Sequence, residues 1–261
     1  MFDLQAHILP TLDIGPASFE DAITLIRALR AEGASHIVAT PYFGAPYPAI
    51  EAAEAQSRVR ALQRMTRQAG IDARLYAAQL VRLDDEGEWA LVKGRAATIN
   101  DGPYALVRLP DEGIPDDAEA RIARLRRAGI IPILAHVERI AQARRDEAAL
   151  EPLVAAGALC QVTLSSLTAS VPADVYRTAA ALLTRNLAHV FGSGAHGSLA
   201  GPAGIAAGLR AAELLVGSQR RWEMAVETPQ AILTGAPLPE REPLSPARTR
   251  TKGFWLQQGA G

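Results

Sequence analysis

The chain has 261 residues, enough for one large α/β domain or two small ones, with 49% hydrophobic and 21% charged residues, which is typical of a protein that buries a full core. Its 27 basic and 28 acidic side chains nearly cancel, so the charge gives no reason to expect a nucleic-acid partner. Without a run of apolar residues long enough to span a bilayer, and without the basic and apolar runs of a signal peptide, the sequence predicts a cytoplasmic protein with no membrane span.

Segments typical of strands and helices alternate along the chain. A short apolar strand at 2–4 precedes a helix that begins after Ser18 and ends at Gly33. The predicted elements that follow are a strand at 36–40, a helix at 49–69, strands at 73–80 and 104–109, a helix at 116–127, a strand at 130–135, a helix at 139–155, a strand at 158–164, a helix at 173–185, a strand at 189–192, and helices over 203–233. Cys160, the sole cysteine, lies in one of these strands and is predicted to be a buried, inert thiol.

This alternation predicts a parallel sheet covered by helices. Six or seven strand–helix units in a chain of this length favour a closed barrel over an open sheet. We therefore predict an α/β fold with a single barrel domain over residues 1–238. A Pro/Arg-rich C-terminal tail follows over 239–261, and we favour a disordered tail, since chain ends are usually loosely held. The alternative is a docking peptide anchored by Phe254, Trp255 and Leu256.

Polar clusters follow several of the predicted strands. They lie at Gln5–His7, Pro41–Phe43, His136–Arg139 and Ser193–His196. In a parallel barrel the carboxyl ends of the strands meet at one face, and that face is where such folds carry out chemistry. The four clusters are therefore predicted to form one site.

The same clusters carry a resemblance to a known family. The segments F-D-L-Q-A-H-I-L-P (2–10), D-I-G-P (13–16), V-A-T-P-Y (38–42), N-D-G-P-Y (100–104), A-H-V-E-R (135–139) and S-G-A-H (193–196) occur in order. Together with a closing segment at 228–238, they are similar to motifs of the PHP-family (polymerase and histidinol phosphatase) tyrosine phosphatases of bacterial capsule and exopolysaccharide biosynthesis. The resemblance covers residues 1–238.

The resemblance implies a distorted barrel of seven β/α units. It also implies a site of three metal ions, usually manganese, that hydrolyses phosphotyrosine by polarising the phosphoryl group and deprotonating a water molecule. The implied partner is the phosphotyrosine tail of a polysaccharide-export tyrosine kinase, or another assembly protein.

Most of the ligands implied by the resemblance are replaced in this chain. Only three histidines match, while the other ligand positions hold neutral residues or an arginine: the matches are His7, His136 and His196, and the replacements are Gln5, Ile14, Tyr42, Leu80, Arg108 and Gly194. Arg108 would place a cation where a carboxylate is expected. At ~4 Å and an effective dielectric constant of ~20, that cation would repel a dication by about 8 kcal/mol. A three-metal cluster is therefore not expected.

These replacements predict a degenerate relative, a pseudophosphatase that acts by binding or regulation and needs no cofactor. The predicted phosphate-binding set, without metal, is His7, Arg108, His136, Arg139 and His196. Arg139 matches an arginine that the family uses near the phosphate, which makes it the one candidate catalytic residue. The competing interpretation is that Arg108 pairs with a nearby acid, such as Glu138 or Asp13, and that the pocket binds nothing.

Two enzymatic alternatives remain open from the sequence. His7, His136 and His196 could hold one zinc ion with an open fourth position, assisted by Asp13 or Glu138, and so form a mononuclear phosphoesterase. Alternatively, unmatched residues could complete a manganese site, and the chain would then be an active protein-tyrosine phosphatase.

Overall fold

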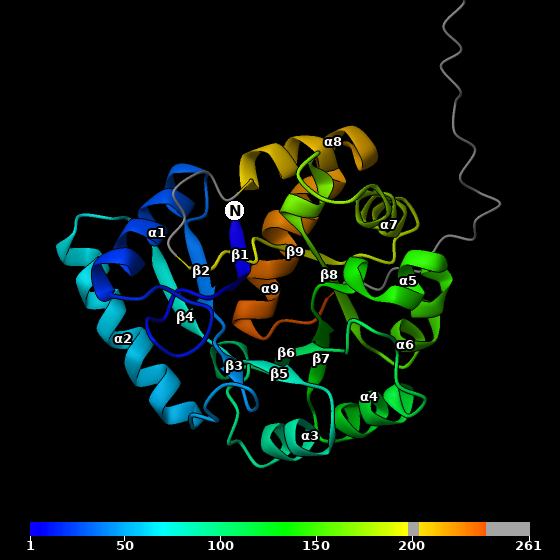
Figure 1. Cartoon of the computed structure of the whole chain (residues 1–261), viewed down its shortest axis with the longest axis horizontal. Helices are drawn as coiled ribbons and strands as arrows, with labels where there is room; N and C mark the ends of the chain where they lie inside the picture. Colours follow the sequence, from blue (N-terminus) through cyan, green and yellow to red (C-terminus); the bar gives the residue numbers. More distant parts are fainter. Residues whose placement is uncertain (198–203, 239–261) are drawn as a thin grey trace, which may run out of the picture.

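The computed structural model describes residues 1–197 and 204–238 (Figure 1). Nine strands are described: β1 Phe2–Ala6, β2 His36–Ala39, β3 Tyr42–Phe43, β4 Arg74–Ala77, β5 Leu80–Arg82, β6 Tyr104–Arg108, β7 Ile131–Leu134, β8 Leu159–Thr163 and β9 Val190–Gly192. The α-helices of these ranges are α1 Phe19–Ala31, α2 Ala52–Gln68, α3 Asp85–Val92, α4 Ala118–Arg127, α5 Ala141–Arg145, α6 Glu151–Ala155, α7 Ala173–Thr184, α8 Ile205–Trp222 and α9 Thr228–Thr234. The π-helical turn Glu223–Glu227 joins the last two helices.

Every strand pair is parallel, and the strands form two sheets in the orders β1-β2-β4 and β3-β5-β6-β7-β8-β9. Two residues separate β2 from β3, and two residues separate β4 from β5. Each pair therefore forms one interrupted strand that passes from the first sheet into the second. A parallel bridge between Ala6 and Ala195 joins β1 to the segment after β9. The strands therefore curl into a distorted ring of seven β/α units, which confirms the predicted α/β barrel fold.

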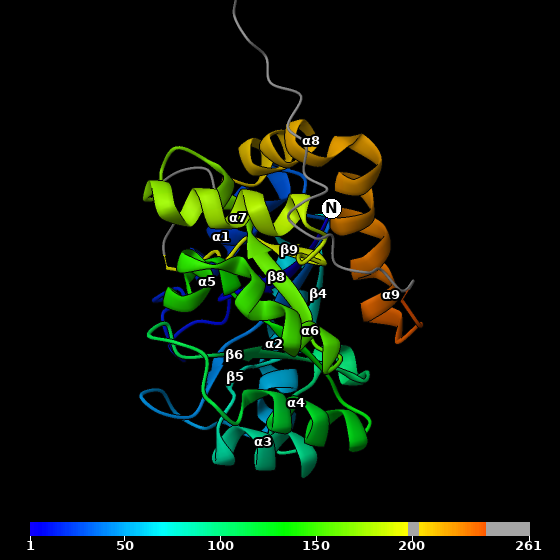
Figure 2. The same ribbon diagram turned by 90° about the vertical axis from the view of Figure 1, so that its right-hand side faces the viewer.

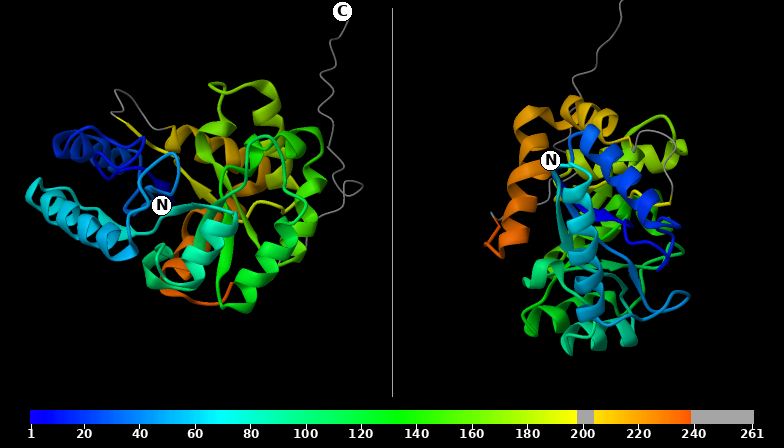
Figure 3. Two further views of the ribbon diagram at one scale, coloured as in Figure 1. Left: turned by 60° about the horizontal axis from the view of Figure 1, so that its bottom comes forward. Right: turned by 90° about the vertical axis from the view of Figure 1, so that its left-hand side faces the viewer.

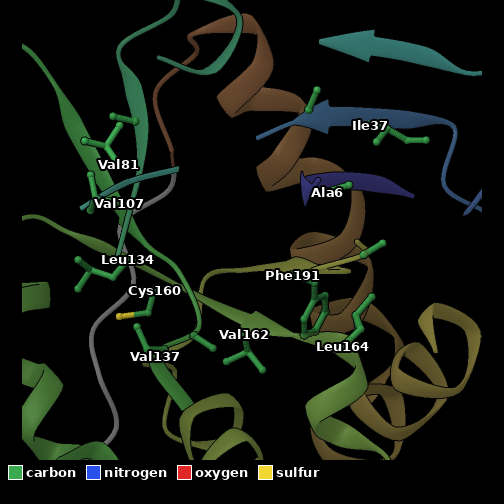
Figure 4. Packing of buried hydrophobic residues seen from close by; sticks show 14 of the residues in the cluster. Ala6, Ile37, Val81, Val107, Leu134, Val137, Cys160, Val162, Leu164 and Phe191 are labelled. Carbon is green, nitrogen blue, oxygen red and sulfur yellow. The ribbon is translucent and has the colours of Figure 1, made fainter. Parts of the chain in front are cut away.

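The helices form a layer outside the strands (Figure 1). Between the two layers lies a buried cluster to which successive strands each contribute, including Ile37, Val81, Val107, Cys160 and Phe191 (Figure 4). Helices α1 and α2 lie side by side over the β1-β2-β4 sheet, as the left view of Figure 3 shows. Burying one such aliphatic side chain contributes roughly 1.5–3 kcal/mol, so this layer is a major source of stability.

A second buried cluster fills the inside of the ring. Alternate residues of the strands point inward, as Tyr104 and Leu106 of β6 do, while Ala105 and Val107 face the helices. Ile232 and Leu233 of α9 join this inner cluster. Helix α9 thus closes one end of the barrel, and the loops that follow the strands lie at the opposite end (Figure 2).

Two predicted elements are divided in the structure. The strand expected at 73–80 is β4 and β5, and the break lies beside Pro41, which has no N–H to donate to the neighbouring strand. The helix expected at 139–155 forms two helices in the structure, α5 and α6. A 3₁₀ turn separates them, and the side chain of Asp146 caps this turn by accepting a hydrogen bond from the N–H of Ala148. The predicted tail at 239–261 lies outside the described residues. Among the described helices, none has the length and apolar character needed to cross a membrane.

Candidate functional site

Two arginines lie side by side at the carboxyl ends of β5 and β6. Arg82 and Arg108 are register partners in these parallel strands. Each lies two residues after a side chain of the inner cluster, Leu80 and Leu106, so both arginines follow the inward-facing rows to the mouth of the barrel. Two adjacent guanidinium groups repel each other, and a shared anion relieves that repulsion.

Both arginines line a cavity of about 220 Å³, together with Tyr42, Tyr47 and the segment Leu109–Glu112. The two tyrosine rings stack with 5.0 Å between their centroids and an interplanar angle of 8°. The Arg108 guanidinium lies 5.5 Å from the centroid of the Tyr42 ring, and its Nη1 donates to the Tyr42 hydroxyl at 3.3 Å. The cavity therefore combines aromatic walls with cationic side chains.

The ion pairs of these arginines are weak ones. Arg108 Nη2 lies 3.4 Å from Asp111 Oδ1, and the Asp111 side chain is 63% exposed. Arg82 Nε lies 3.3 Å from Asp84 Oδ2, and these side chains are 61% and 43% exposed. An exposed ion pair contributes little to stability, so these partners leave the two guanidinium groups available to an incoming anion.

His7 and Asp13 form a buried pair beside this cavity. His7 Nδ1 lies 2.6 Å from Asp13 Oδ2, and the two side chains are 2% and 1% exposed. Asp13 also accepts hydrogen bonds from the backbone N–H groups of Gly15 and Tyr42. The His7 ring packs on Tyr42 with 4.9 Å between the ring centroids. Asp13 therefore fixes the orientation of the imidazole.

His136 is held by both of its ring nitrogens. Its Nε2 lies 2.5 Å from Gln5 Nε2, and its Nδ1 lies 2.8 Å from Thr163 Oγ1. Burial lowers the pKa of His136 to about 3, and the positive charge of Arg139 adds to this effect. His136 is therefore a neutral, hydrogen-bonded residue at the centre of the site.

The remaining predicted residues lie at the rim. His196 is exposed and makes no hydrogen bond to a described side chain; burial of part of the ring and the nearby His7 lower its pKa. Arg139 is about half exposed, and its Nε lies 3.9 Å from Glu138 Oε1. Glu138 itself is buried, where it accepts hydrogen bonds from Ser166 and from the backbone of Thr163.

The five residues predicted to bind phosphate all lie at or after the carboxyl ends of strands at one end of the barrel, but of the five only Arg108 lines the described cavity. His7, Arg108, Arg139 and His196 all lie close enough to His136 to lower its pKa. Arg108 does pair with a nearby acid, as the competing interpretation expected, but that acid is Asp111. Glu138 and Asp13 bind Ser166 and His7 instead. Sequence reasoning missed Arg82 as a lining residue; its position two residues after the inward-facing Leu80 was the available signal.

The residues present do not fit the metal cluster that the resemblance implies. The described parts of the chain contain no group of three or more His, Cys, Asp or Glu side chains that could hold a metal ion. Gln5 contacts His136 directly, and Arg108 stands at the mouth where a carboxylate is implied. Gly194 has a φ of +62°, and a Cβ there would lie 3.3 Å from His136 Cε1, so an aspartate at this position would be strained as well as crowded.

The mononuclear zinc arrangement does not fit either. A histidine must offer a free ring nitrogen to bind zinc. Both nitrogens of His136 have hydrogen-bond partners, and Glu138 is turned into the protein to meet Ser166. Only His7 Nε2 and the ring of His196 are left without a described hydrogen-bond partner, which is one ligand fewer than such a site requires.

Comparisons with known proteins agree on one family. Residues 1–234 match the family model described as capsular polysaccharide synthesis, CpsB/CapC. The chain is 31% identical to tyrosine-protein phosphatase YwqE of Bacillus subtilis over 196 residues, covering 75% of this chain and 77% of YwqE. It is 26% identical to tyrosine-protein phosphatase CpsB of Streptococcus pneumoniae over 245 residues, covering 89% of this chain and 98% of CpsB.

The fold agrees with these matches. A solved chain from the crystal structures of YwqE from Bacillus subtilis and CpsB from Streptococcus pneumoniae superposes with a TM-score of 0.88 at 27% identity, covering 94% of this chain and 98% of that one. Those proteins are described as unique metal-dependent tyrosine phosphatases. Their description favours a bound metal over the expectation of no cofactor, whereas the side chains of this site argue the opposite.

Proposed function

The chain belongs to the CpsB/CapC family of capsular polysaccharide synthesis, and from this premise we propose that it recognises phosphotyrosine at the mouth of its barrel without the metal-dependent hydrolysis of its relatives. The phosphoryl group would lie against Arg108 and Arg82, with Arg139 and His196 at the rim. The tyrosyl ring would pack in the cavity that Tyr42 and Tyr47 help to line.

The observation that carries this proposal is the position of Arg108. The Arg108 side chain lines the cavity and is 34% exposed. Among the described residues, its one carboxylate partner is the solvent-exposed Asp111, at 3.4 Å. Guanidinium groups bind phosphate through paired, charge-assisted hydrogen bonds. A cavity of about 220 Å³ is large enough for the side chain of a phosphotyrosine.

The second candidate is a metal-dependent protein-tyrosine phosphatase. The names of the relatives favour it, and they give no support to a wholly non-catalytic pseudophosphatase. The side-chain contacts of Gln5, His136 and Arg108 weigh against it, because a metal would have to displace them. A metal count separates the two candidates more directly than any comparison does.

The test measures binding and metal content on the same preparation. Titration calorimetry with a phosphotyrosine peptide and with its unphosphorylated form should show binding of the phosphorylated form only. Arg108→Gln should weaken that binding, and Arg58→Gln in α2, whose guanidinium pairs with Glu54, serves as the matched control. Equal binding of both peptides would contradict the proposal. Two or three manganese ions per desalted chain would establish the second candidate instead.

Family membership supports a role in capsular or exopolysaccharide synthesis. A phosphorylated kinase tail as the partner and a cytoplasmic location remain predictions from the sequence. Capture of the phosphorylated kinase tail by the wild-type protein, but not by Arg108→Gln, would support that choice of partner.

A further inference from the structure

We infer that the cavity prefers phosphotyrosine peptides that carry a lysine or arginine next to the phosphorylated residue, and that Asp111 and Glu112 determine this preference. The inference rests on the proposed recognition of phosphotyrosine by Arg108 and Arg82. It goes further by naming the charge of the neighbouring ligand residue and the side chains that bind it.

The cavity is lined by side chains of both charges. Arg82 and Arg108 line it from the ends of β5 and β6, and Asp111 and Glu112 line it from the loop that follows β6. Both acidic side chains are exposed, and no basic side chain of the described residues other than Arg108 forms an ion pair with either of them. A phosphate alone complements the arginines but is repelled by the carboxylates, whereas a phosphate with a neighbouring cation complements both.

Asp111 competes with the phosphoryl group for Arg108. Asp111 Oδ1 lies 3.4 Å from Arg108 Nη2, and the Asp111 side chain is 63% exposed. So long and exposed an ion pair contributes little to stability, which allows the carboxylate to exchange partners readily. A phosphoryl group bound to Arg108 repels the adjacent Asp111 carboxylate. A lysine or arginine of the ligand gives Asp111 a new partner and leaves Arg108 to the phosphate.

The turn that carries the two acidic residues is held in place by its backbone. The N–H of Gly113 donates to the carbonyl of Pro110 at 3.3 Å, and the N–H of Ala141, the first residue of α5, donates to the carbonyl of Asp111 at 2.9 Å. The backbone of Asp111 therefore stays beside the cavity while its side chain exchanges partners. Because its carboxylate stays near Arg108, the ligand cation has to lie near the phosphate, which is the position of a residue adjacent to the phosphotyrosine.

The test compares peptides that differ only beside the phosphotyrosine. One peptide has lysine before it, one has lysine after it, one has glutamine on both sides and one has glutamate on both sides. Fluorescence anisotropy with the full chain at low salt measures each affinity. We expect the tighter lysine peptide to bind about 5-fold more tightly than the glutamine peptide, as one favourable exposed ion pair allows, and the glutamate peptide to bind most weakly. High salt should reduce these differences.

A double variant removes both carboxylates with little change in side-chain size. Asp111→Asn combined with Glu112→Gln should bind the glutamine peptide more tightly than wild type does, because no carboxylate then competes for Arg108, and it should lose the preference for lysine. The matched control combines Asp116→Asn with Glu119→Gln. These two exposed residues change the net charge by the same amount but do not line the cavity, so the control should keep the preference.

The outcomes separate this inference from the proposed function. Equal binding of the lysine, glutamine and glutamate peptides would overturn the inference and leave phosphotyrosine recognition standing. A lysine preference that the double variant retains would also overturn it, because other residues would then bind the cation. So would a preference that the control loses to the same extent, since that would reflect net charge alone. Failure of every phosphorylated peptide to bind would remove the proposed function together with the inference.

Discussion

Gln5 and His136 meet across the inside of the barrel, with their Nε2 atoms 2.5 Å apart. One residue belongs to the first strand and the other follows β7, so the contact joins opposite sides of the ring. It occupies the position that a metal would need in order to bind His136. We therefore expect this pair to affect both the stability of the mouth of the barrel and the binding of a metal there.

Removing the Gln5 amide should destabilise the protein. Gln5→Leu keeps the volume of the side chain but leaves His136 Nε2 buried without a partner, which costs about 1–3 kcal/mol. Urea unfolding followed by circular dichroism measures this change. Gln68→Leu, at the exposed end of α2, is the control and should change the free energy of unfolding by less than about 0.5 kcal/mol. Equal effects would mean that the Gln5–His136 contact contributes nothing.

Phosphotyrosine affinity should depend on Arg108 more than on Arg82. Arg108 is 34% exposed and Arg82 is 61% exposed, so salt screens Arg82 more strongly. We expect Arg108→Gln to weaken binding by about 10- to 100-fold, from a charge-assisted bond of about 1.5–3 kcal/mol, and Arg82→Gln to weaken it only a few-fold. Calorimetry at low and high salt tests both values. A larger loss for Arg82→Gln would place the phosphoryl group elsewhere.

The stability of the protein should depend on pH through Asp3. Burial raises the pKa of Asp3 to about 6, although Ser193 and the Gln5 N–H donate hydrogen bonds to it. The folded protein therefore holds this proton more tightly than the unfolded chain does. The stabilisation is complete below about pH 4 and is lost as the pH rises to about 6, with a total on the order of 3 kcal/mol.

The measurement is the difference in unfolding free energy between wild type and Asp3→Asn from pH 4 to pH 8. His136 makes a pH-dependent contribution of the opposite sign, because its lowered pKa makes the fold lose stability as the pH falls below about 6.5. This contribution is common to both proteins, so it cancels in the difference. Asp72→Asn, with a fully exposed side chain, is the control. A difference that does not change with pH would show that Asp3 is ionised throughout this range.

Metal uptake should return as the implied ligands are restored. We expect Gln5→His combined with Arg108→Glu to retain more manganese after desalting than wild type, because the pair of changes adds a ligand and removes a cation repelled by about 8 kcal/mol at ~4 Å. Metal per chain by mass spectrometry is the readout, and Arg58→Glu is the control for the change of charge. Equal metal content in the wild type and the double variant would mean that residues other than Gln5 and Arg108 control metal binding.

The sequence could predict the barrel because each unit has a local signal. Ser18 caps α1 through Asp21, and buried residues recur at helical spacing in α1 and α2. It could not predict the division at residues 78–79. That division depends on which strand lies beside Pro41, and such a tertiary relationship has no local pattern.

The sequence could predict which residues form the site, but it predicted the contacts between them less well. The order of the motifs was enough to gather His7, Arg108 and His136 at one end of the barrel. The partner of each side chain depended on details such as the left-handed backbone of His136, with a φ of 56°, which turns its ring toward Thr163. The cavity lined by Tyr42 and Tyr47 requires the loop after β3 to fold back, and no residue pattern specifies that.

The bridge between Ala6 and Ala195 has a consequence for synthesis on the ribosome. The first strand finds its second neighbour only after nearly 190 further residues have been made, and α9, which closes the other end, emerges later still. Until then the nascent chain exposes an unpaired strand edge and an open apolar interior. Such late, long-range pairing slows folding and leaves that edge open to association with other chains until the barrel closes.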